Sequence, residues 1–434
     1  MSKLDKLLRE LCPDGVEYKK LGEIATISRG GNFQKKDFLT EGVPCIHYGQ
    51  IYTKYGLFTD KTFTFISEEC AKKQKMAQPD DIVMAVTSEN IEDVCKCLAW
   101  LGDESVAVSG HSAIIHHNQN AKYLVYYFHS QMFFAQKRKL AHGTKVIEVT
   151  PDALVDITLP IPPAEIQCEI VRILDNFTNL TAELTAELTA RQKQYTFYRN
   201  KLLTFSGNEK AKIVKISLGD IGPICMCKRI LKSQTNTVEG VPFYKIGTFG
   251  KKADAYISKE TFDEYRSKYS FPKKGDVLIS AAGTIGRTVV YDGKPAYFQD
   301  SNIVWIDNNE RVVLNSYLRY CYELKPWKVS SGGTIQRLYN DNIAKAIITV
   351  PSLDVQNRIV NVLDNFEKIC SDLNIGLPAE IEARQKQYEY YRDKLLTFAE
   401  TGNTILSRAE QSRAEQSRAE QSRAEQSRAE QSTD

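Results

Sequence analysis

Residues 190–205 read ARQKQYTFYRNKLLTF, and residues 383–398 read ARQKQYEYYRDKLLTF. Thirteen of these sixteen positions are identical, at an offset of 193 residues. Upstream, IPPAEIQCEIVRILDNF (161–177) is repeated as VPSLDVQNRIVNVLDNF (350–366), at an offset of 189 residues. Fainter matches precede them: LGEIATI (21–27) with LGDIGPI (218–224), and EGVPCIHYG (41–49) with EGVPFYKIG (239–247). A period this long is a whole domain plus a helix, which excludes a solenoid.

The strongly repeated blocks are predicted to be long helices. Their apolar residues recur at steps of three and four, which is typical of a coiled-coil seam. The first helix, over 161–206, would span about 60 Å and stop at Gly207. The second, over 350–400, should be kinked or broken at Gly376 and Pro378. Because a lone helix would leave its apolar stripe in water, we expect the two to pair antiparallel. The predicted helix-pairing seam consists of Ile170, Ile173, Phe177, Leu180, Leu184, Leu188, Ile359, Val362, Phe366, Ile369 and Leu373.

The two offsets differ by four residues, close to one helical turn. Between LDNF and RQKQY the first block has 13 residues and the second has 17. The shorter spacer contains TAELTAEL (181–188), a four-residue unit written twice. Adding or removing one unit would change the rod by about 6 Å while keeping the seam on its face. We interpret the spacer as a ruler; a plain helix-forming tandem is the alternative.

The diverged blocks, 1–160 and 207–349, are predicted to be two similar globular domains. Strand-like runs such as DIVMAVTSEN (81–90) and DVLISAAGTIG (276–286) alternate with helical stretches at 121–141 and 315–324. This pattern favours an α+β fold. The expected organisation is therefore a pseudo-twofold internal repeat: domain 1–160, helix 161–206, domain 207–349, helix 350–400 and a tail at 401–434.

Basic and amide-bearing side chains cluster in the two globular blocks, although the net charge of the chain is only +3. Lys and Arg suit DNA phosphates, and Arg, Asn, Gln, Ser and Thr suit base edges. Each cluster alone could be an ordinary solvated face. Two such domains joined by helices of defined length favour DNA binding. The candidate DNA-binding residues are Arg29, Gln34, Lys35, Lys36, His47, Tyr48, Ser88, Asn90, Lys137, Arg138, Lys145, Lys228, Arg229, Lys232, Gln234, Lys245, Lys251, Arg287, Thr334, Gln336 and Arg337.

Motifs for catalysis, metal binding and export are missing from the sequence. There is no G-x-G-x-x-G, no G-x4-G-K-(S/T), and IPPA (161–164) contains the only Pro-Pro, so no methylase tetrad is present. PDGVEYK (13–19) is too compact for a nuclease triad. The ten cysteines include C-x-C pairs but no C-x-x-C, which favours packed thiols over a metal site. The N-terminus lacks an apolar signal segment and no stretch could span a membrane, so a cytoplasmic location is expected.

The paired LPIPPAEIQ…ILDNF…RQKQYTFYRNKLLTF and TVPSLDVQ…VLDNF…RQKQYEYYRDKLLTF, with the TAEL spacer, resemble type I restriction-modification specificity subunits over about residues 1–400. The resemblance implies two target recognition domains that each read half of a bipartite double-stranded DNA site. It implies no catalytic residues in this chain. Two methyltransferase subunits and restriction-translocase subunits would be the partners, and they would use S-adenosylmethionine, ATP and Mg²⁺. A non-catalytic scaffold with two protein-binding modules remains the alternative.

The tail departs from that resemblance. Residues 407–431 are SRAEQ written five times. A polar, charge-balanced repeat of this kind buries nothing, and we expect a disordered or solvated segment. A repeated AGCAG pentanucleotide would encode it, so we interpret the repeat as the mark of a slippage-prone gene tract; a solubilising tail is the alternative.

Overall fold

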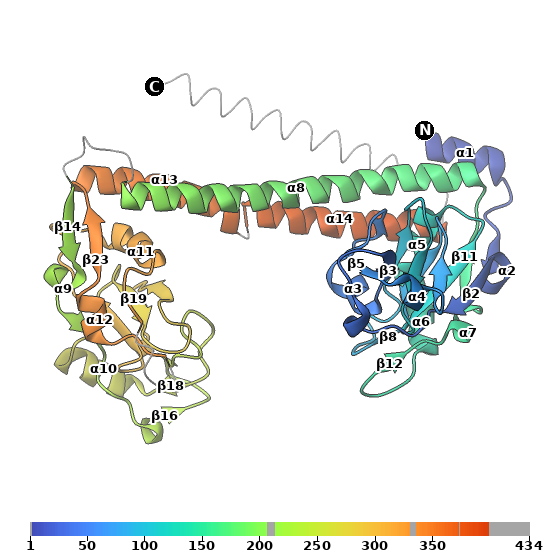
Figure 1. Ribbon diagram of the computed structural model, residues 1–434. Coiled ribbons are helices and arrows are strands. Elements are labelled where there is room, and N and C mark those ends of the chain that lie inside the picture. The colour runs from blue at the N-terminus through green and yellow to red at the C-terminus, as the bar shows by residue number, and fades with distance from the viewer. Residues whose placement is uncertain (1, 206–212, 330–335, 373, 399–434) are drawn as a thin grey trace. The chain divides into compact units, whose positions relative to one another are not determined.

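The computed structural model describes residues 2–205, 213–329, 336–372 and 374–398. The chain divides into two compact units: Met1–Glu183 with Ile381 onward form the first, and Leu184–Glu380 form the second. Each unit holds one globular part and segments of the long helices (Figure 1). Residues 1–160 are called the first module and residues 207–349 the second module. The predicted tail at 401–434 lies outside the described residues.

The first module is built on a five-stranded sheet, ordered β2-β11-β7-β9-β4, and a four-stranded sheet, ordered β5-β3-β10-β6. Successive residues of β7 face opposite sides, as a strand requires. Ile82 and Met84 join the core with helix α5 (Ala121–Phe128), while Val83 and Ala85 join the core shared with the four-stranded sheet. The main strands are β2 Ala25–Arg29, β3 Val43–Ile46, β4 Phe58–Thr59, β5 Thr64–Ile66, β6 Lys75–Ala77, β7 Ile82–Ala85, β9 Cys97–Trp100, β10 Val106–Val108 and β11 Ser112–His117.

Short pairs and helices complete the first module. Strand β8 pairs with β12, and β1 pairs with β13. The helical stretch predicted at 121–141 is two helices, because Ser130 caps a new helix with its side chain on the amide of Phe133. The remaining elements are α1 Lys3–Leu11, β1 Tyr18–Lys20, α2 Leu21–Ile24, η1 Lys35–Asp37, α3 Tyr48–Thr53, α4 Glu68–Ala71, β8 Thr87–Ser88, α5 Ala121–Phe128, α6 Gln131–Leu140, β12 Ile147–Glu148, α7 Pro151–Leu154 and β13 Thr158–Pro160.

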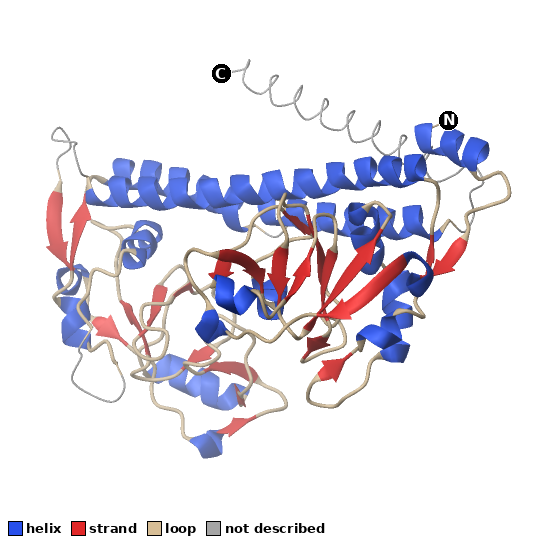
Figure 2. Ribbon diagram, turned by 45° about the vertical axis from the view of Figure 1, so that its right-hand side comes forward, coloured by secondary structure: helices blue, strands red, loops and turns tan. Residues whose placement is uncertain are grey.

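The second module repeats this plan with two four-stranded sheets, ordered β15-β22-β19-β20 and β16-β18-β17-β21. The strands of both modules are drawn red in Figure 2. This mixture of helix and sheet confirms the predicted α+β class. The elements are β14 Val214–Ser217, α9 Leu218–Ile221, β15 Ile224–Cys225, η2 Lys232–Gln234, β16 Thr235–Asn236, β17 Val241–Tyr244, β18 Tyr256–Ile257, α10 Lys259–Lys268, β19 Val277–Ser280, β20 Thr288–Val290, β21 Tyr297–Phe298, β22 Ile303–Ile306, α11 Asn315–Glu323, α12 Asn340–Ala344 and β23 Ile347–Val350.

Helix α8 (Ala164–Thr204) is continuous over 41 residues, about 60 Å of rise. It ends at Phe205, whose φ of 55° is left-handed and whose amide bonds the carbonyl of Lys201 at 3.0 Å. The equivalent Phe398 ends the second repeat in the same way, with φ of 45°. The predicted stop at Gly207 lies outside the described residues. The left-handed residue that closes the helix is a phenylalanine.

The second long block is interrupted where the sequence predicts. Helix α13 (Leu353–Ser371) and helix α14 (Leu377–Thr397) are separate. The amide of Gly376 bonds the carbonyl of Asp372 at 3.0 Å, and the chain restarts as a helix with Pro378 in its first turn. Proline lacks an amide donor and is tolerated at this position. The four extra residues of this spacer therefore lie around a break.

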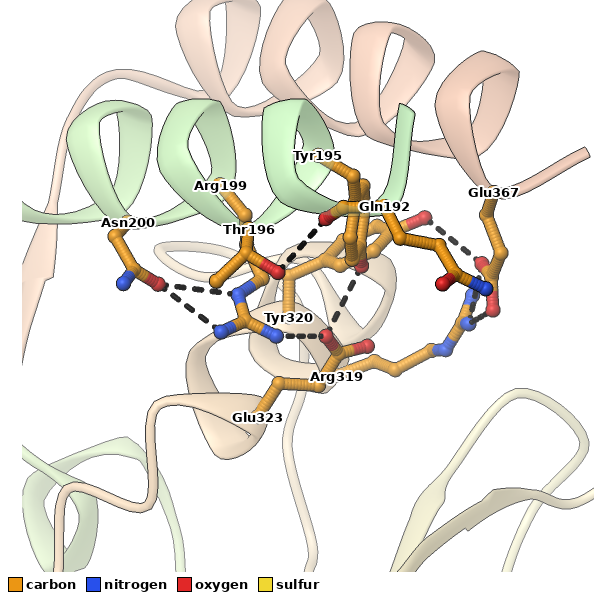
Figure 3. Close-up of polar contacts among 9 residues, drawn as sticks. All are labelled: Gln192, Tyr195, Thr196, Arg199, Asn200, Arg319, Tyr320, Glu323 and Glu367. Carbon is orange, nitrogen blue, oxygen red and sulfur yellow. Dashed lines mark hydrogen bonds and ion pairs between the residues drawn. The ribbon is translucent and has the colours of Figure 1, made fainter. Parts of the chain in front are cut away.

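Side chains from three helices fasten the second unit together (Figure 3). Arg199 of α8 pairs with Glu323 of α11 at 2.9 Å, and Tyr195 donates to the same carboxylate at 3.0 Å. Arg319 of α11 pairs with Glu367 of α13. These contacts tie the long helices to the module beneath them.

Helices α8 and α13 run antiparallel in the second unit. Tyr198 stacks on Phe366, and Arg191, seven residues earlier, interacts electrostatically with Cys370, four residues later. A later position on one helix thus meets an earlier position on the other, as antiparallel pairing predicts.

The predicted seam is partly wrong. Val362 and Ile369 are exposed, whereas the adjacent Leu363 and Cys370 are buried. Helix α13 packs against α11 as well as α8, so its buried face is rotated by one position, about 100°. Ile170 and Ile359 are buried as predicted, Ile173 and Phe177 pack against the first core, and Leu180 lies at the surface. Phe366 is half-buried, as are Leu184 and Leu188, and Leu373 lies outside the described residues.

A buried glutamine joins helix to module at the same place in each unit. Gln167 accepts from the amide of Asn120 at 3.0 Å and donates to the carbonyl of Pro162 at 2.8 Å. Gln356, 189 residues later, accepts from the amide of Leu314 at 2.9 Å and donates to the carbonyl of Pro351 at 2.9 Å. The sequence repeat is therefore a repeat of structure, down to single hydrogen bonds.

Candidate nucleic-acid interface

One pair of parallel strands recurs in both modules. In the first, β3 is parallel to β10; in the second, β17 is parallel to β21. The carboxyl ends of parallel strands meet at one edge, where the residues that follow them come together. The two EGVP segments of the sequence lead into β3 and β17. The residues that follow each EGVP segment therefore lie at equivalent edges of the two modules.

Aromatic rings and histidines gather at this edge in the first module. The amide of Tyr48 donates to Ser109 Oγ at 2.8 Å, which joins the two strand ends. The ring of Tyr48 lies between His47, with centroids 4.6 Å apart, and His111, at 4.9 Å. Burial lowers the pKa of His47, which favours the neutral form of this ring. This part of the edge therefore holds aromatic rings and hydrogen-bonding groups, of which His47 and Ser109 are themselves buried.

Arg29, at the end of β2, is held beside these rings. Its Nη2 contacts Glu148 Oε1 at 2.6 Å, and its Nε donates to the carbonyl of Gly110 at 2.8 Å. The side chain remains 47% exposed. Ser88 lies nearby, because β8 pairs with β12 and places Ser88 opposite Ile147. An exposed guanidinium whose orientation is fixed matches the forked geometry that guanine and phosphate accept.

The second module joins its strand ends in the same way. The amide of Ile246 donates to Gln299 Oε1 at 3.0 Å, which is the counterpart of the Tyr48–Ser109 contact. Arg337 Nη2 donates to the carbonyl of Ser301 at 2.7 Å. The predicted residue Lys245 directly precedes Ile246 and pairs with Asp254 at 2.9 Å. Lys245 thus occupies the position at which the first module has His47, and Arg337 adjoins the same edge.

Two more predicted arginines adjoin this edge. Arg229 lies 3.9 Å from Asp300, the residue between Gln299 and Ser301. Arg287, at the end of the β19–β20 loop, donates Nη1 to the carbonyl of Phe249 at 3.0 Å. Four predicted residues of the second module, Arg229, Lys245, Arg287 and Arg337, are therefore connected to one set of loops.

Lys137 was wrongly predicted to face DNA. It is buried, and its Nζ donates to the carbonyls of Glu92 at 2.9 Å and Val94 at 2.5 Å. Burial lowers its pKa. The ammonium is used inside the fold to hold the loop between β7 and β9, so it cannot reach a phosphate.

The remaining predicted residues lie apart from the strand ends or serve local structure. Gln34 and Lys36 line a hollow of about 370 Å³ beside η1, and Lys35 is exposed on the same turn. Asn90 closes a turn through Asp93, with its side-chain amide 2.9 Å from that carboxylate. Gln234 bonds Tyr265 at 3.2 Å. Arg138, Lys145, Lys228, Lys232, Lys251 and Gln336 are exposed, and Thr334 lies outside the described residues.

Sequence reasoning missed Ser109, His111, Gln299 and Ser301. They follow β10 and β21, whose parallel partners are distant in the sequence (Ala107 pairs with Cys45, and Tyr297 with Phe243), so no local periodicity marks them. The sequence offers one signal for these residues, the spacing from each EGVP segment to the later strand-like run. This spacing identifies them only when the pairing of the two strands is already known.

The described residues contain no group of three or more His, Cys, Asp or Glu placed to hold a metal ion. No helix in the described part of the chain combines the length and apolarity needed to cross a bilayer. Both edges hold hydrogen-bonding groups and an arginine, and the first also holds aromatic rings, an arrangement suited to binding an extended polar ligand.

Comparisons with known proteins agree with this arrangement. The chain matches the family described as type I restriction modification DNA specificity domain over residues 13–191 and again over 210–383. A Haemophilus influenzae protein named as a type I restriction enzyme specificity subunit is 44% identical over 408 residues, covering 91% of this chain and 98% of that one. The Escherichia coli EcoR124I/EcoR124II specificity subunit is 32% identical over 249 residues, covering 54% and 59%.

A solved structure shares the fold. It comes from work on complex assembly and conformational transition of the type I R-M system, and it aligns with a TM-score of 0.57 at 18% identity. The alignment covers 88% of this chain and 98% of that chain.

Proposed function

The chain belongs to the type I restriction-modification DNA specificity family and is the non-catalytic specificity subunit of such a system, with two target recognition domains; we propose that each domain reads one half of a bipartite DNA site through the edge where its parallel strands end. The observation that carries this proposal is the duplicated edge, joined by Tyr48–Ser109 in one module and Ile246–Gln299 in the other. Each edge holds an oriented arginine, the exposed Arg29 in the first module and the half-buried Arg337 in the second.

Base reading would fall to these groups by their chemistry. Guanidinium groups pair with guanine O6 and N7, while neutral imidazole and hydroxyl groups can donate to or accept from base edges. Exposed lysines around the edges would contact phosphates and set the register without reading sequence. The protein-binding scaffold, the alternative function, offers no reason for oriented arginines at both edges.

The partners would supply the chemistry. We place methyltransferase subunits and restriction-translocase subunits on the helical parts, as in a type I assembly. S-adenosylmethionine, ATP and Mg²⁺ would then be bound by those subunits, and this chain would bind none of them. The complex would work in the cytoplasm, where chromosomal DNA is available.

A domain exchange tests the proposal. Residues 13–160 would be replaced by the matching segment of the Haemophilus influenzae relative, and the complex would be expressed with its methyltransferase in a host without other methylation. Methylation-sensitive sequencing should show one half of the modified motif changed and the other half and the gap retained. A change in both halves, or in neither, would refute one-domain, one-half-site reading.

Point variants refine the assignment within each half. Arg29→Gln should relax or abolish recognition of one half-site, and Arg337→Gln should do the same for the other. The exposed Arg138→Gln variant is the matched control, because Arg138 lies away from the strand ends. If the Arg29→Gln variant methylated the same motif as the wild type, Arg29 would not be a residue that reads the DNA sequence.

A further inference from the structure

The two modules differ sharply in charge. Residues 207–349 contain 22 Lys and Arg against 14 Asp and Glu, a formal charge of +8. Residues 1–160 contain 19 against 20, a formal charge of −1. The net +3 of the whole chain conceals this difference. The basic excess of the protein belongs to the second module.

The difference reaches equivalent positions at the strand-end edges. The contact of Tyr48 with Ser109 corresponds to that of Ile246 with Gln299, so the preceding residues, His47 and Lys245, are counterparts. A neutral imidazole in one module is thus an ammonium in the other.

A second pair of equivalent positions reverses charge. The amide of Val149 bonds the carbonyl of Val86 at 3.0 Å, and the amide of Leu338 bonds the carbonyl of Ala281 at 2.8 Å. Each contact joins the segment before a short helix, α7 or α12, to the residue that follows strand β7 or β19. The residues before Val149 and Leu338 are Glu148 and Arg337, so a carboxylate in the first module is a guanidinium in the second.

The loops beside the edges show the same contrast. The loop between β7 and β9 carries the acids Glu89, Glu92 and Asp93 and one base, Lys96, whereas the loop between β19 and β20 carries Arg287 and no acid. In the described part of the second module, Lys228, Lys232 and Lys251 are exposed and take part in no ion pair. Uncompensated cations of this kind are available to phosphates.

We infer that the second module supplies most of the sequence-independent, phosphate-dependent affinity for double-stranded DNA, while the first module contributes chiefly hydrogen bonding and stacking, since its Arg29 is already paired with Glu148. This division rests on the proposed function. Its physical basis is that cations that neutralise phosphates release condensed counterions, whereas neutral contacts release none. The second module would therefore hold non-specific DNA, and the first would engage when a matching half-site arrives.

Salt dependence measures this division directly. Two triple variants of the full chain would remove the same charge from different modules: Lys228→Gln with Lys232→Gln and Lys251→Gln, and Lys35→Gln with Lys36→Gln and Lys145→Gln. Fluorescence anisotropy on a random-sequence duplex across a salt series gives the slope of log K against log salt. Each phosphate contact contributes about 0.9 to that slope. All six lysines are exposed, and unchanged thermal unfolding would verify that both variants fold.

The second-module variant should lose about 2 to 3 units of slope, and the first-module variant less than about 1. Equal losses, or a larger loss from the first module, would overturn the division while leaving the proposed function intact. If wild-type binding showed no salt dependence at all, both the division between the modules and the proposed DNA-binding function would be overturned. The two outcomes therefore distinguish a failure of the division from a failure of the proposed function.

Discussion

Phe177 lies stacked on Tyr391 in the first unit, with ring centroids 5.4 Å apart and an interplanar angle of 22°. In the second unit Phe366 stacks on Tyr198, at 6.0 Å and 30°. Both phenylalanines end an LDNF motif, and both tyrosines belong to the RQKQY blocks. The chain therefore makes the same contact twice. Each copy joins the LDNF segment of one long helical block to the RQKQY segment of the other block.

The two stacks should stabilise their own units. We expect Phe177→Ala to destabilise the first unit and Phe366→Ala the second, each by about 1 to 3 kcal/mol, because a partly exposed ring loses less than a fully buried one. Hydrogen exchange should quicken in α14 for the first variant and in α13 for the second. Phe197→Ala, at a ring that is 60% exposed, is the control. Quickening spread equally over both units would contradict this locality.

Lys137 should hold the loop between β7 and β9. Lys137→Met removes the donor to the carbonyls of Glu92 and Val94, and unsatisfied buried carbonyls cost about 1 to 3 kcal/mol. Amides of residues 88–96 should exchange faster, and the salt slope of DNA binding should stay unchanged because the buried ammonium touches no phosphate. Lys139→Met, at an exposed neighbour on α6, should alter neither measurement. A reduced slope for Lys137→Met would restore the original DNA-contact prediction.

His129 should make stability depend on pH. The Nδ1–H of this half-buried ring donates to the carbonyl of Val125 at 2.8 Å, and desolvation lowers the pKa of the ring to about 4. The unfolded chain binds the proton near pH 6.5 and the folded chain only near pH 4. The contribution of His129 to the free energy of unfolding is complete above pH 6.5. It decreases as the pH is lowered from 6.5 to about 4, by at most about 1.4 kcal/mol per pH unit.

Urea unfolding of the wild type and of His129→Gln isolates that contribution, since other titrating groups are common to both proteins. The free energy of unfolding should fall more steeply for the wild type between pH 6.5 and 4. Parallel curves would mean that His129 titrates normally in the folded chain.

The TAEL spacer should set the gap of the DNA target. A third Thr-Ala-Glu-Leu unit after Leu188 would lengthen α8 by about 6 Å and keep its faces in place. We expect the methylated motif to retain both half-sites and to gain one or two base pairs between them, given about 3.4 Å per step. Inserting only two residues, which turns the helix by about 200°, is the control and should abolish methylation. An unchanged gap after the four-residue insertion would refute the ruler.

The sequence by itself determined the duplication, the long helices and the break in the second. These follow from local properties: apolar spacing, proline chemistry and near-identity of the repeats do not depend on distant partners. It also marked Arg29, His47, Tyr48, Lys245 and Arg337 by residue type.

Only the tertiary structure decided which of those residues meet. Ser109 and Gln299 reach the strand-end edges through parallel pairing across long stretches of chain, which no local pattern encodes. Burial of Lys137, and of Leu363 in place of Val362, depends on what packs against each helix. Contacts made at long range are set by the packing of whole elements, and so a window of sequence cannot contain them.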